Sequence, residues 1–239
     1  MKKDKKVIAY ALYGDEARYT INAIINAEIC QKIYPDWECT FYHDETVSSK
    51  IISKLQTYPN VKLINMRYAF FPSIHSFHSL KMFWRLLSYE DPTVDVTIFR
   101  DTDSYPSERE SNAVKQWLET GKSLHIMRET QPGHFSKIMG GMWGIRKNYK
   151  VISSIITNIV NTPSQNTDQN YLAYAVYPYF ENDRVVHDND NAFGDTTHEW
   201  PSKRTPNDEM YIGRTQFPPI PESGQVERYK NLEKDIYNT

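Results

Sequence analysis

Residues 94–103 read Val-Asp-Val-Thr-Ile-Phe-Arg-Asp-Thr-Asp, and this stretch decides both the fold and the place of the site. The β-branched and aromatic run over 94–99 predicts a buried strand. Side chains at i and i+2 of an extended chain point to the same side, so Asp101 and Asp103 can converge just beyond the strand. Carboxylate oxygens placed in this way suit a divalent cation that carries phosphate, with Mg²⁺ and Mn²⁺ as the candidates.

The D-x-D pattern by itself is weakly specific. A second copy occurs at Asp188-Asn189-Asp190, in a stretch with the character of a loop. The first copy stands out because it follows a predicted core strand. The alternative for Asp101 and Asp103 is a capping role at the following turn, where Asp is common.

The composition limits the classes of function. The 239 residues suffice for one sizeable α/β domain or two small ones. A formal net charge of −2 provides no basic field, so nucleic acid is not expected as a partner. No apolar run approaches the roughly 18 residues of a membrane-spanning helix, so no transmembrane segment is expected.

The cysteines and the first residues predict a cytoplasmic protein. Cys30 falls in a predicted helix and Cys39 in a predicted strand, which is typical of buried free thiols in a reducing compartment. The basic start is interrupted by Asp4, and the apolar run of about six residues after it is too short for a secretory signal. We expect a first strand behind a solvated tail.

Strand and helix patterns alternate along most of the chain. The predicted strands cover residues 7–12, 39–42, 61–64, 94–99, 124–127 and 184–187, with a further strand entered after Gly140. The predicted helices cover residues 21–33, 47–55, 78–87, 149–160 and 168–177. Another begins with a capping box at Ser107 and Glu110 and ends at Gly121. This alternation predicts the α/β class, with a mainly parallel sheet and helices on both faces.

The predicted organisation is one domain over residues 1–188, followed by an irregular Pro-rich segment over 189–239 that packs on or closes over the site. Ligands of parallel α/β sheets bind at the carboxyl ends of the strands. Gly14-Asp15 and Asp101-Thr102-Asp103 both follow such ends. This agreement supports a site there independently of the D-x-D pattern.

Several motifs that follow one another between residues 7 and 188 resemble a known family. They are Ala9-Tyr10-Ala11-Leu12-Tyr13-Gly14-Asp15, Ile33-Tyr34-Pro35-Asp36-Trp37, Met82-Phe83-Trp84-Arg85, Arg100-Asp101-Thr102-Asp103-Ser104 with Ser107-Glu108-Arg109-Glu110, His125-Ile126-Met127-Arg128, Gly140-Gly141-Met142-Trp143-Gly144 and Asp168-Gln169. With them the chain resembles the GT-A-type, D-x-D-containing glycosyltransferases, especially the compact enzymes of large algal (chlorella) viruses and related bacterial proteins. The resemblance implies a single GT-A-like domain with a Rossmann-like nucleotide-binding half.

The resemblance also implies an activity of the hexosyltransferase type. A sugar would pass from a nucleotide diphosphate donor, usually a UDP-sugar, to a saccharide or glycan acceptor, with Mn²⁺ or Mg²⁺ as the cofactor. Asp101 and Asp103 would hold the cation, with Asp103 the more direct ligand. His187 resembles the third ligand of such enzymes, although His198 competes for this role and a lone His is more often structural.

The loop after the first strand is expected to hold the nucleotide, through Leu12, Tyr13 and Gly14 with Arg18 nearby. Gly14 permits close approach of the backbone and Tyr13 offers a ring to the base. The alternative is an ordinary turn between a strand and a helix.

Further donor contacts are assigned to Thr102, Arg85, Arg100, Gly140 and Gly141. The arginines could bind the diphosphate or the donor sugar, or could form surface salt bridges. The glycines would admit the sugar, or would only serve packing where the strand begins.

Asp168 and Asp103 are the catalytic candidates. Asp168 opens a predicted helix, where an N-cap role would explain it. By resemblance it also faces the acceptor. It would accept the acceptor's hydroxyl proton if the anomeric centre inverts, and would orient the donor sugar if configuration is retained.

Two rival functions remain. A haloacid-dehalogenase-like phosphotransferase also carries D-x-D after a buried strand, but near its N-terminus and with Thr or Val where this chain has Tyr105. A non-catalytic nucleotide-sugar-binding module would keep the fold but would need no metal carboxylates.

Overall fold

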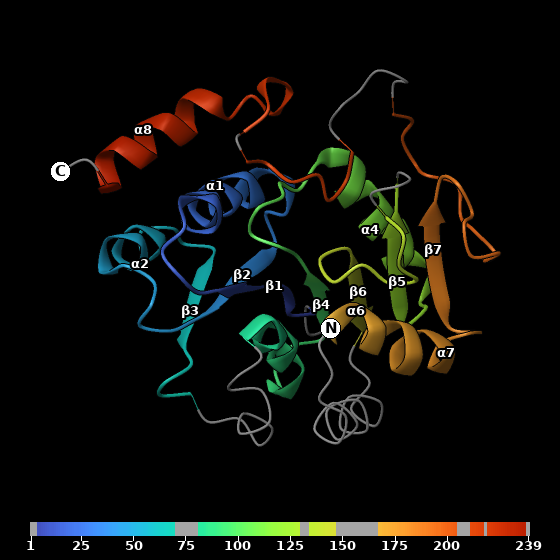
Figure 1. The fold of residues 1–239 in the computed structure, drawn as a ribbon. Helices are drawn as coiled ribbons and strands as arrows, with labels where there is room; N and C mark the ends of the chain where they lie inside the picture. Colours follow the sequence, from blue (N-terminus) through green and yellow to red (C-terminus); the bar gives the residue numbers. More distant parts are fainter. Residues whose placement is uncertain are drawn as a thin grey trace.

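The computed structural model describes residues 4–69, 81–129, 134–146, 167–204, 211–217 and 219–237. Within these ranges a seven-stranded sheet forms the centre of the molecule (Figure 1). Its strands are β1 Lys6–Leu12, β2 Trp37–His43, β3 Val61–Asn65, β4 Val96–Phe99, β5 Leu124–Arg128, β6 Trp143–Arg146 and β7 Arg184–Asp188. Their order in the sheet is β3-β2-β1-β4-β6-β5-β7.

Strand direction determines which ends meet at the site. β1 runs parallel to β2 and β4, β2 to β3, and β5 to β7, whereas β6 runs antiparallel to β4 and β5. Phe99, the last residue of β4, pairs with Ala9 of β1 and with Trp143, the first residue of β6. The loop before β6 and the loop after β4 therefore lie at one edge of the sheet.

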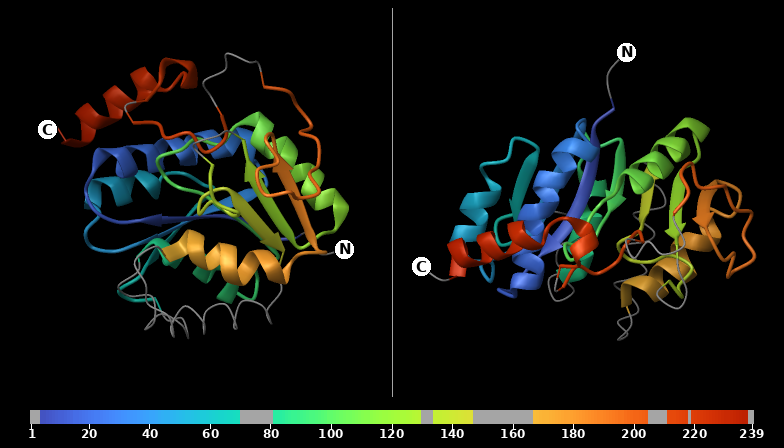
Figure 2. Two further views of the ribbon diagram at one scale, coloured as in Figure 1. Left: turned by 45° about the vertical axis from the view of Figure 1, so that its right-hand side comes forward. Right: turned by 90° about the horizontal axis from the view of Figure 1, so that it is seen from above.

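Helices cover both faces of the sheet (Figures 1 and 2). One face carries α1 Ala17–Ile33, α2 Ser49–Leu55 and α4 Glu108–Thr120. The other face carries the 3₁₀-helix η1 Lys81–Glu90 and, much later in the chain, three consecutive elements: α6 Thr167–Tyr171, the π-helix η2 Leu172–Val176 and α7 Tyr177–Tyr179. The predicted fold class, a mainly parallel sheet with helices on both faces, is confirmed.

β1 shows why this sequence forms a sheet with two covered faces. Its residues Val7 and Ala9 pack toward η1 and η2, whereas Ile8, Tyr10 and Leu12 pack toward α1 and α2. Successive side chains of a strand point to opposite faces, so burial of both faces requires an unbroken apolar run.

The C-terminal segment contains a helix that the sequence-based prediction missed. After a short 3₁₀ turn, η3 Pro221–Ser223, helix α8 Val226–Tyr237 packs outside α1 (Figure 1). Tyr229, Leu232 and Ile236 form its buried stripe. The expectation of an irregular segment to the end of the chain is therefore wrong over α8.

The predicted start of α4 is half right. Ser107 caps the helix, since its hydroxyl oxygen accepts the Glu110 N–H at 3.2 Å, and Gly121 ends it in the left-handed region at φ 75°. The Glu110 side chain, however, turns into the core, where it accepts hydrogen bonds from Arg100 and Tyr34. A buried ion pair thus replaces the second half of the capping box.

The other predicted strands agree with the observed ones to within a few residues. Cys30 and Cys39 are free and buried. The helix predicted over 149–160 lies outside the described residues. In the part of the chain that the structure describes, no helix combines the length and apolar character needed to cross a bilayer.

Candidate functional site

A cavity of about 600 Å³ lies at the carboxyl ends of β1 and β4 and opens to solvent. Eight of the residues that the sequence analysis assigned to a site line it. These residues are Tyr13, Arg85, Asp101, Thr102, Asp103, Gly140, Gly141 and Asp168. Segments that are far apart in the sequence therefore meet in one cavity.

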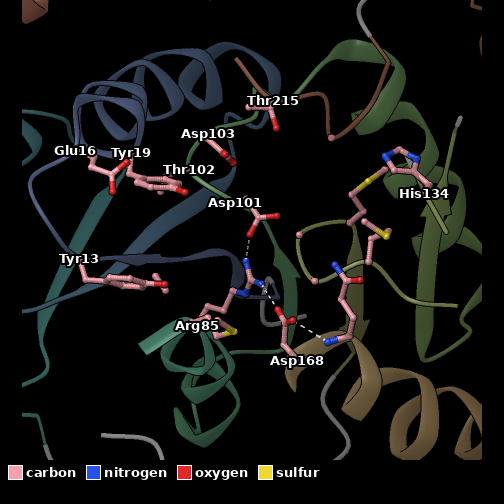
Figure 3. Close-up of a pocket in the computed structure, with 18 of the residues that line it drawn as sticks. Tyr13, Glu16, Tyr19, Arg85, Asp101, Thr102, Asp103, His134, Asp168 and Thr215 are labelled. Carbon is pink, nitrogen blue, oxygen red and sulfur yellow. Dashed lines mark hydrogen bonds and ion pairs between the residues drawn. The ribbon is translucent and has the colours of Figure 1, made fainter. Parts of the chain in front are cut away.

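Arg85 organises the acidic side chains of this cavity. Figure 3 shows it between Asp101 and Asp168. Its guanidinium forms an ion pair with Asp101, donates to Asp168 Oδ2 at 2.9 Å and donates to the carbonyl oxygen of Arg100 at 3.2 Å. Burial disfavours the charge of Arg85, but the two carboxylates outweigh this effect and raise its pKa. Arg85 is a fixed, buried cation beneath the cavity.

Asp103 is paired with a different arginine. Its side chain is 12% exposed, and Oδ2 accepts from Arg18 Nε at 2.8 Å and from Arg18 Nη2 at 2.5 Å. Burial raises the pKa of Asp103 above its ordinary value, and the hydrogen bonds from Arg18 only partly oppose that rise. Arg18, from the first turn of α1, therefore reaches the site through Asp103.

The two glycines before β6 leave room for the carboxylates. A Cβ atom on Gly141 would lie 2.6 Å from Asp101 Cγ, and a Cβ atom on Gly140 would lie 2.8 Å from Arg85 Nη2. Both distances are far below van der Waals contact. Residues without a side chain are thus needed where the loop before β6 crosses the acidic cluster.

Asp168 lies in the first turn of α6 rather than at an N-cap. Besides the hydrogen bond from Arg85, its Oδ1 accepts the Gln169 N–H at 2.8 Å. These two donors hold the carboxylate in one orientation at the cavity wall.

The structure corrects the assignment of Arg100 to the donor. Its side chain is 3% exposed, and its guanidinium donates to Glu110 Oε1 at 2.7 Å and to the carbonyl oxygens of Phe99 at 2.6 Å and Trp143 at 3.2 Å. Neighbouring residues of an extended chain point to opposite sides, so Arg100 points away from Asp101. Arg100 ties β4 to β6 and α4 inside the core.

The structure also separates His187 from the two aspartates. β7 is three strand spacings of about 4.8 Å each away from β4. The ring nitrogens of His187 lie 2.8 Å from His125 Nε2 and 2.6 Å from Gln116 Oε1. Burial, together with nearby His198, lowers the pKa of His187 to about 3. His187 is a core histidine, and the competing candidate His198 lies beside it rather than beside the carboxylates.

Two further predicted residues, Leu12 and Gly14, do not line the cavity. Leu12 is buried against α1 in the core. Gly14 adopts φ 79° and its N–H donates to Thr46 Oγ1 at 2.7 Å. The turn at Gly14, whose positive φ glycine adopts without strain, places Tyr13 at the cavity, so the contribution of Gly14 is conformational.

The sequence analysis missed several lining residues that adjoin predicted ones. Glu16 and Tyr19 belong to the start of α1 and lie with Tyr13 on one side of Asp101, whereas His134 lies on the other side (Figure 3). The position of Glu16 and Tyr19 a few residues after Tyr13-Gly14 was the signal in the sequence that could have identified them. Gln169 and Met139 likewise adjoin predicted residues.

A second group of lining residues that was not predicted individually comes from the C-terminal segment, which was expected to pack on or close over the site. Gln216 N–H donates to the Asp103 carbonyl oxygen at 2.7 Å, and Thr215 forms a β-bridge with Ser104. Ile212 N–H donates to the buried Glu129 at 2.6 Å. These contacts bring Tyr211, Gly213 and Thr215 to the cavity. No local sequence pattern in this stretch identifies these three residues as cavity-lining residues.

The donor set can be tested for its fit to a divalent cation. Within the described ranges, no three His, Cys, Asp or Glu side chains gather as a metal site. Mg²⁺ in phosphate-handling enzymes is usually held by one or two carboxylates together with substrate phosphates. Asp101 and Asp103 supply two carboxylates at the wall of an open cavity. They therefore fit a cation that binds together with a diphosphate, and do not form a closed protein cage.

Comparison with known proteins gives a likeness of fold only. No protein-family model matches the sequence, and no curated protein matches it. Similar solved structures include a glycosyltransferase involved in glycosylation of the major capsid of PBCV-1 (14% identity, TM-score 0.48, 77% of this chain and 81% of that one). Another is 4-diphosphocytidyl-2C-methyl-D-erythritol synthase from Anaerococcus prevotii (12% identity, TM-score 0.48, 78% of this chain and 87% of that one).

A third similar structure is the mannosyltransferase PcManGT from Pyrobaculum calidifontis in complex with GDP-Man and Mn²⁺ (11% identity, TM-score 0.49). The aligned part is 79% of this chain and 56% of that one. At such identities the likeness concerns the fold alone. The function has to be argued from the residues of the cavity.

Proposed function

We propose that the chain is a glycosyltransferase that moves a sugar from a nucleotide diphosphate donor, a UDP-sugar, to a saccharide or glycan acceptor, with Mn²⁺ or Mg²⁺ as the cofactor. The observation that carries this proposal is the convergence of Asp101 and Asp103 on one cavity together with Arg85 and Asp168. Two carboxylates for a cation, buried positive charge and a further oriented carboxylate are what transfer from a diphosphate donor requires.

The cavity offers different surroundings on its two sides. Tyr13 and Tyr19 present rings on which a nucleobase can stack, and Glu16 presents a carboxylate that can accept from ribose hydroxyls. A volume of about 600 Å³ lies within the usual range for sites of small organic ligands. The donor nucleotide would bind on the side of β1 and α1.

The leaving diphosphate sets the main electrostatic demand. Asp101 and Asp103 would hold the cation, which when bound supplies Lewis-acid stabilisation of the charge that develops on the phosphates. Arg85 and Arg18 add guanidinium groups that match phosphate oxygens in geometry and charge. Arg85 is held in position before the substrate arrives, so this group need not reorganise during the reaction.

Asp168 would act on the acceptor or on the donor sugar. In an inverting reaction one of its carboxylate oxygens accepts the proton of the attacking hydroxyl. In a retaining reaction the same carboxylate accepts hydrogen bonds from the donor sugar. In both cases Arg85 fixes its orientation.

The rival phosphotransferase needs the first aspartate as a free nucleophile. Here Oδ1 of the Asp101 carboxylate is paired with the buried Arg85, and this ion pair lowers the nucleophilicity of that oxygen. This contact disfavours a nucleophilic role for Asp101.

Release of UDP from a panel of UDP-sugars, with Mn²⁺ and with EDTA, tests the proposal. We expect at least one donor to be hydrolysed or transferred in a Mn²⁺-dependent way, and the same donor to raise the melting temperature because it binds the folded state. Phosphatase turnover, release of pyrophosphate from a nucleoside triphosphate, or donor binding without turnover in the presence of candidate acceptors would contradict it.

A further inference from the structure

Arg18 occupies Oδ2, one of the two carboxylate oxygens of Asp103 that a cation could use. Its Nε and Nη2 atoms lie 2.8 Å and 2.5 Å from the same oxygen, Oδ2. Hydrogen bonds between charged groups at these distances are strong. A metal ion that uses this oxygen has to displace the guanidinium.

Arg18 is free to leave in a way that Arg85 is not. The side chain of Arg85 is 6% exposed and is held by two carboxylates and a backbone carbonyl. The side chain of Arg18 is 34% exposed, and its guanidinium is held by Asp103 and lies 5.2 Å from the ring centroid of Tyr19. Release from Asp103 would return Arg18 to water or to another anion, and a cation bound to Asp103 would then compensate the charge of that largely buried carboxylate.

The position of Arg18 in its helix argues against a role in helix stability. It lies in the first turn of α1, which contains no acidic residue. A cation in the first turn is disfavoured by the helix dipole. The ion pair with Asp103, at the edge of the cavity, is therefore the interaction that accounts for an arginine at this place.

We propose that Arg18 is an exchangeable counter-ion of the metal site, an inference that rests on the proposed function. In the free protein its guanidinium neutralises Asp103. When cation and nucleotide diphosphate bind together, the cation replaces the guanidinium on Asp103 and Arg18 moves to the phosphate oxygens, which it can bind through two nitrogens. The cation alone gives Arg18 no new partner, so it binds weakly without nucleotide.

This exchange couples the affinities of the two ligands. UDP tightens the binding of Mn²⁺, and by thermodynamic linkage Mn²⁺ tightens the binding of UDP by the same factor. Without Arg18, Mn²⁺ no longer competes with a guanidinium, and UDP loses one phosphate contact. The coupling factor must then fall.

The test measures the dissociation constant of Mn²⁺ with and without UDP, by calorimetry and by the paramagnetic resonance signal of free Mn²⁺. In Arg18→Gln we expect Mn²⁺ alone to bind about tenfold more tightly than in the wild type, and the coupling factor to fall about tenfold. Arg18→Lys keeps the charge but loses the contact through two nitrogens, so its values should lie between those of the wild type and Arg18→Gln. Arg67→Gln, which removes an exposed arginine paired with Glu45 beyond β3, should change neither quantity.

The outcomes separate the inference from the proposed function. If the wild type binds Mn²⁺ with UDP, Asp103→Asn loses this binding and folded Arg18→Gln binds Mn²⁺ alone no more tightly than the wild type, the counter-ion role is refuted and the metal site stands. If the wild type binds no Mn²⁺ even with UDP, the metal-dependent function and the inference both fall. Circular dichroism establishes that each variant is folded.

Discussion

Replacement of Asp103 by Asn is expected to lower Mn²⁺-stimulated release of UDP by about a thousandfold, the size of effect that follows loss of a group that stabilises developing charge. Asn has nearly the same shape as Asp but supplies no anionic oxygen to a cation. Because Asp103 lies at the cavity wall and not in the core, the variant should keep its fold. Initial rates at saturating Mn²⁺, together with melting curves, measure both effects.

The chain provides a matched control for this experiment. Asp190 belongs to the second D-x-D copy but is exposed beyond β7 and does not line the cavity. Asp190→Asn removes the same charge from the same short motif and should leave turnover unchanged. Equal activity of Asp103→Asn and Asp190→Asn would remove the D-x-D carboxylates from the mechanism.

Replacement of Glu110 by Ala is expected to lower the free energy of unfolding by about 3–5 kcal/mol, because it leaves a buried guanidinium without its counter-ion. Arg100 and Glu110 are 3% and 2% exposed and lie 2.7 Å apart. Urea unfolding followed by circular dichroism measures the change. Glu119→Ala on the exposed side of the same helix should change stability by no more than about 0.5 kcal/mol.

A double variant tests whether this pair acts as described. Arg100→Met together with Glu110→Leu replaces both charges by apolar groups, and such replacements of buried pairs are often neutral or stabilising. We expect the double variant to be more stable than Glu110→Ala. It should also retain donor binding, because Arg100 lies outside the cavity. Loss of donor binding in the folded double variant would show that Arg100 contributes to the donor site after all.

Local sequence patterns predict most of this fold. The unbroken apolar run of β1 indicates a buried strand and the isoleucines of α1 recur at helical spacing, and both elements form where these patterns indicate. The site is predictable for a related reason, because the carboxyl ends of neighbouring parallel strands meet at one edge. Tyr13, Asp101 and Asp103 meet there although about ninety residues of chain separate the first from the last.

Local sequence patterns do not predict which distant segments contact one another. His187 precedes Asp188, the last residue of β7, a position that resembles that of a metal ligand, but strand order places β7 at the edge of the sheet, three strands from β4. Tyr211 and Thr215 reach the cavity only because backbone groups of their segment pair with Ser104, Asp103 and Glu129. Neither arrangement could be predicted without the order of the strands and the path of the C-terminal segment.

Helix α8 is a different case, because its signal is present in the sequence. Tyr229, Leu232 and Ile236 recur at helical spacing, and no proline occurs after Pro221. The prolines from Pro201 to Pro221 disfavour regular structure before this stretch but not within it. The helical spacing after the last proline indicates the helix.

Diffraction from a crystal grown with Mn²⁺ and UDP, recorded where manganese scatters anomalously, tests the central claim most directly. The account predicts one anomalous peak in contact with the carboxylates of Asp101 and Asp103 and with the diphosphate. An anomalous peak elsewhere, or a bound diphosphate with no manganese beside these two side chains, would contradict it.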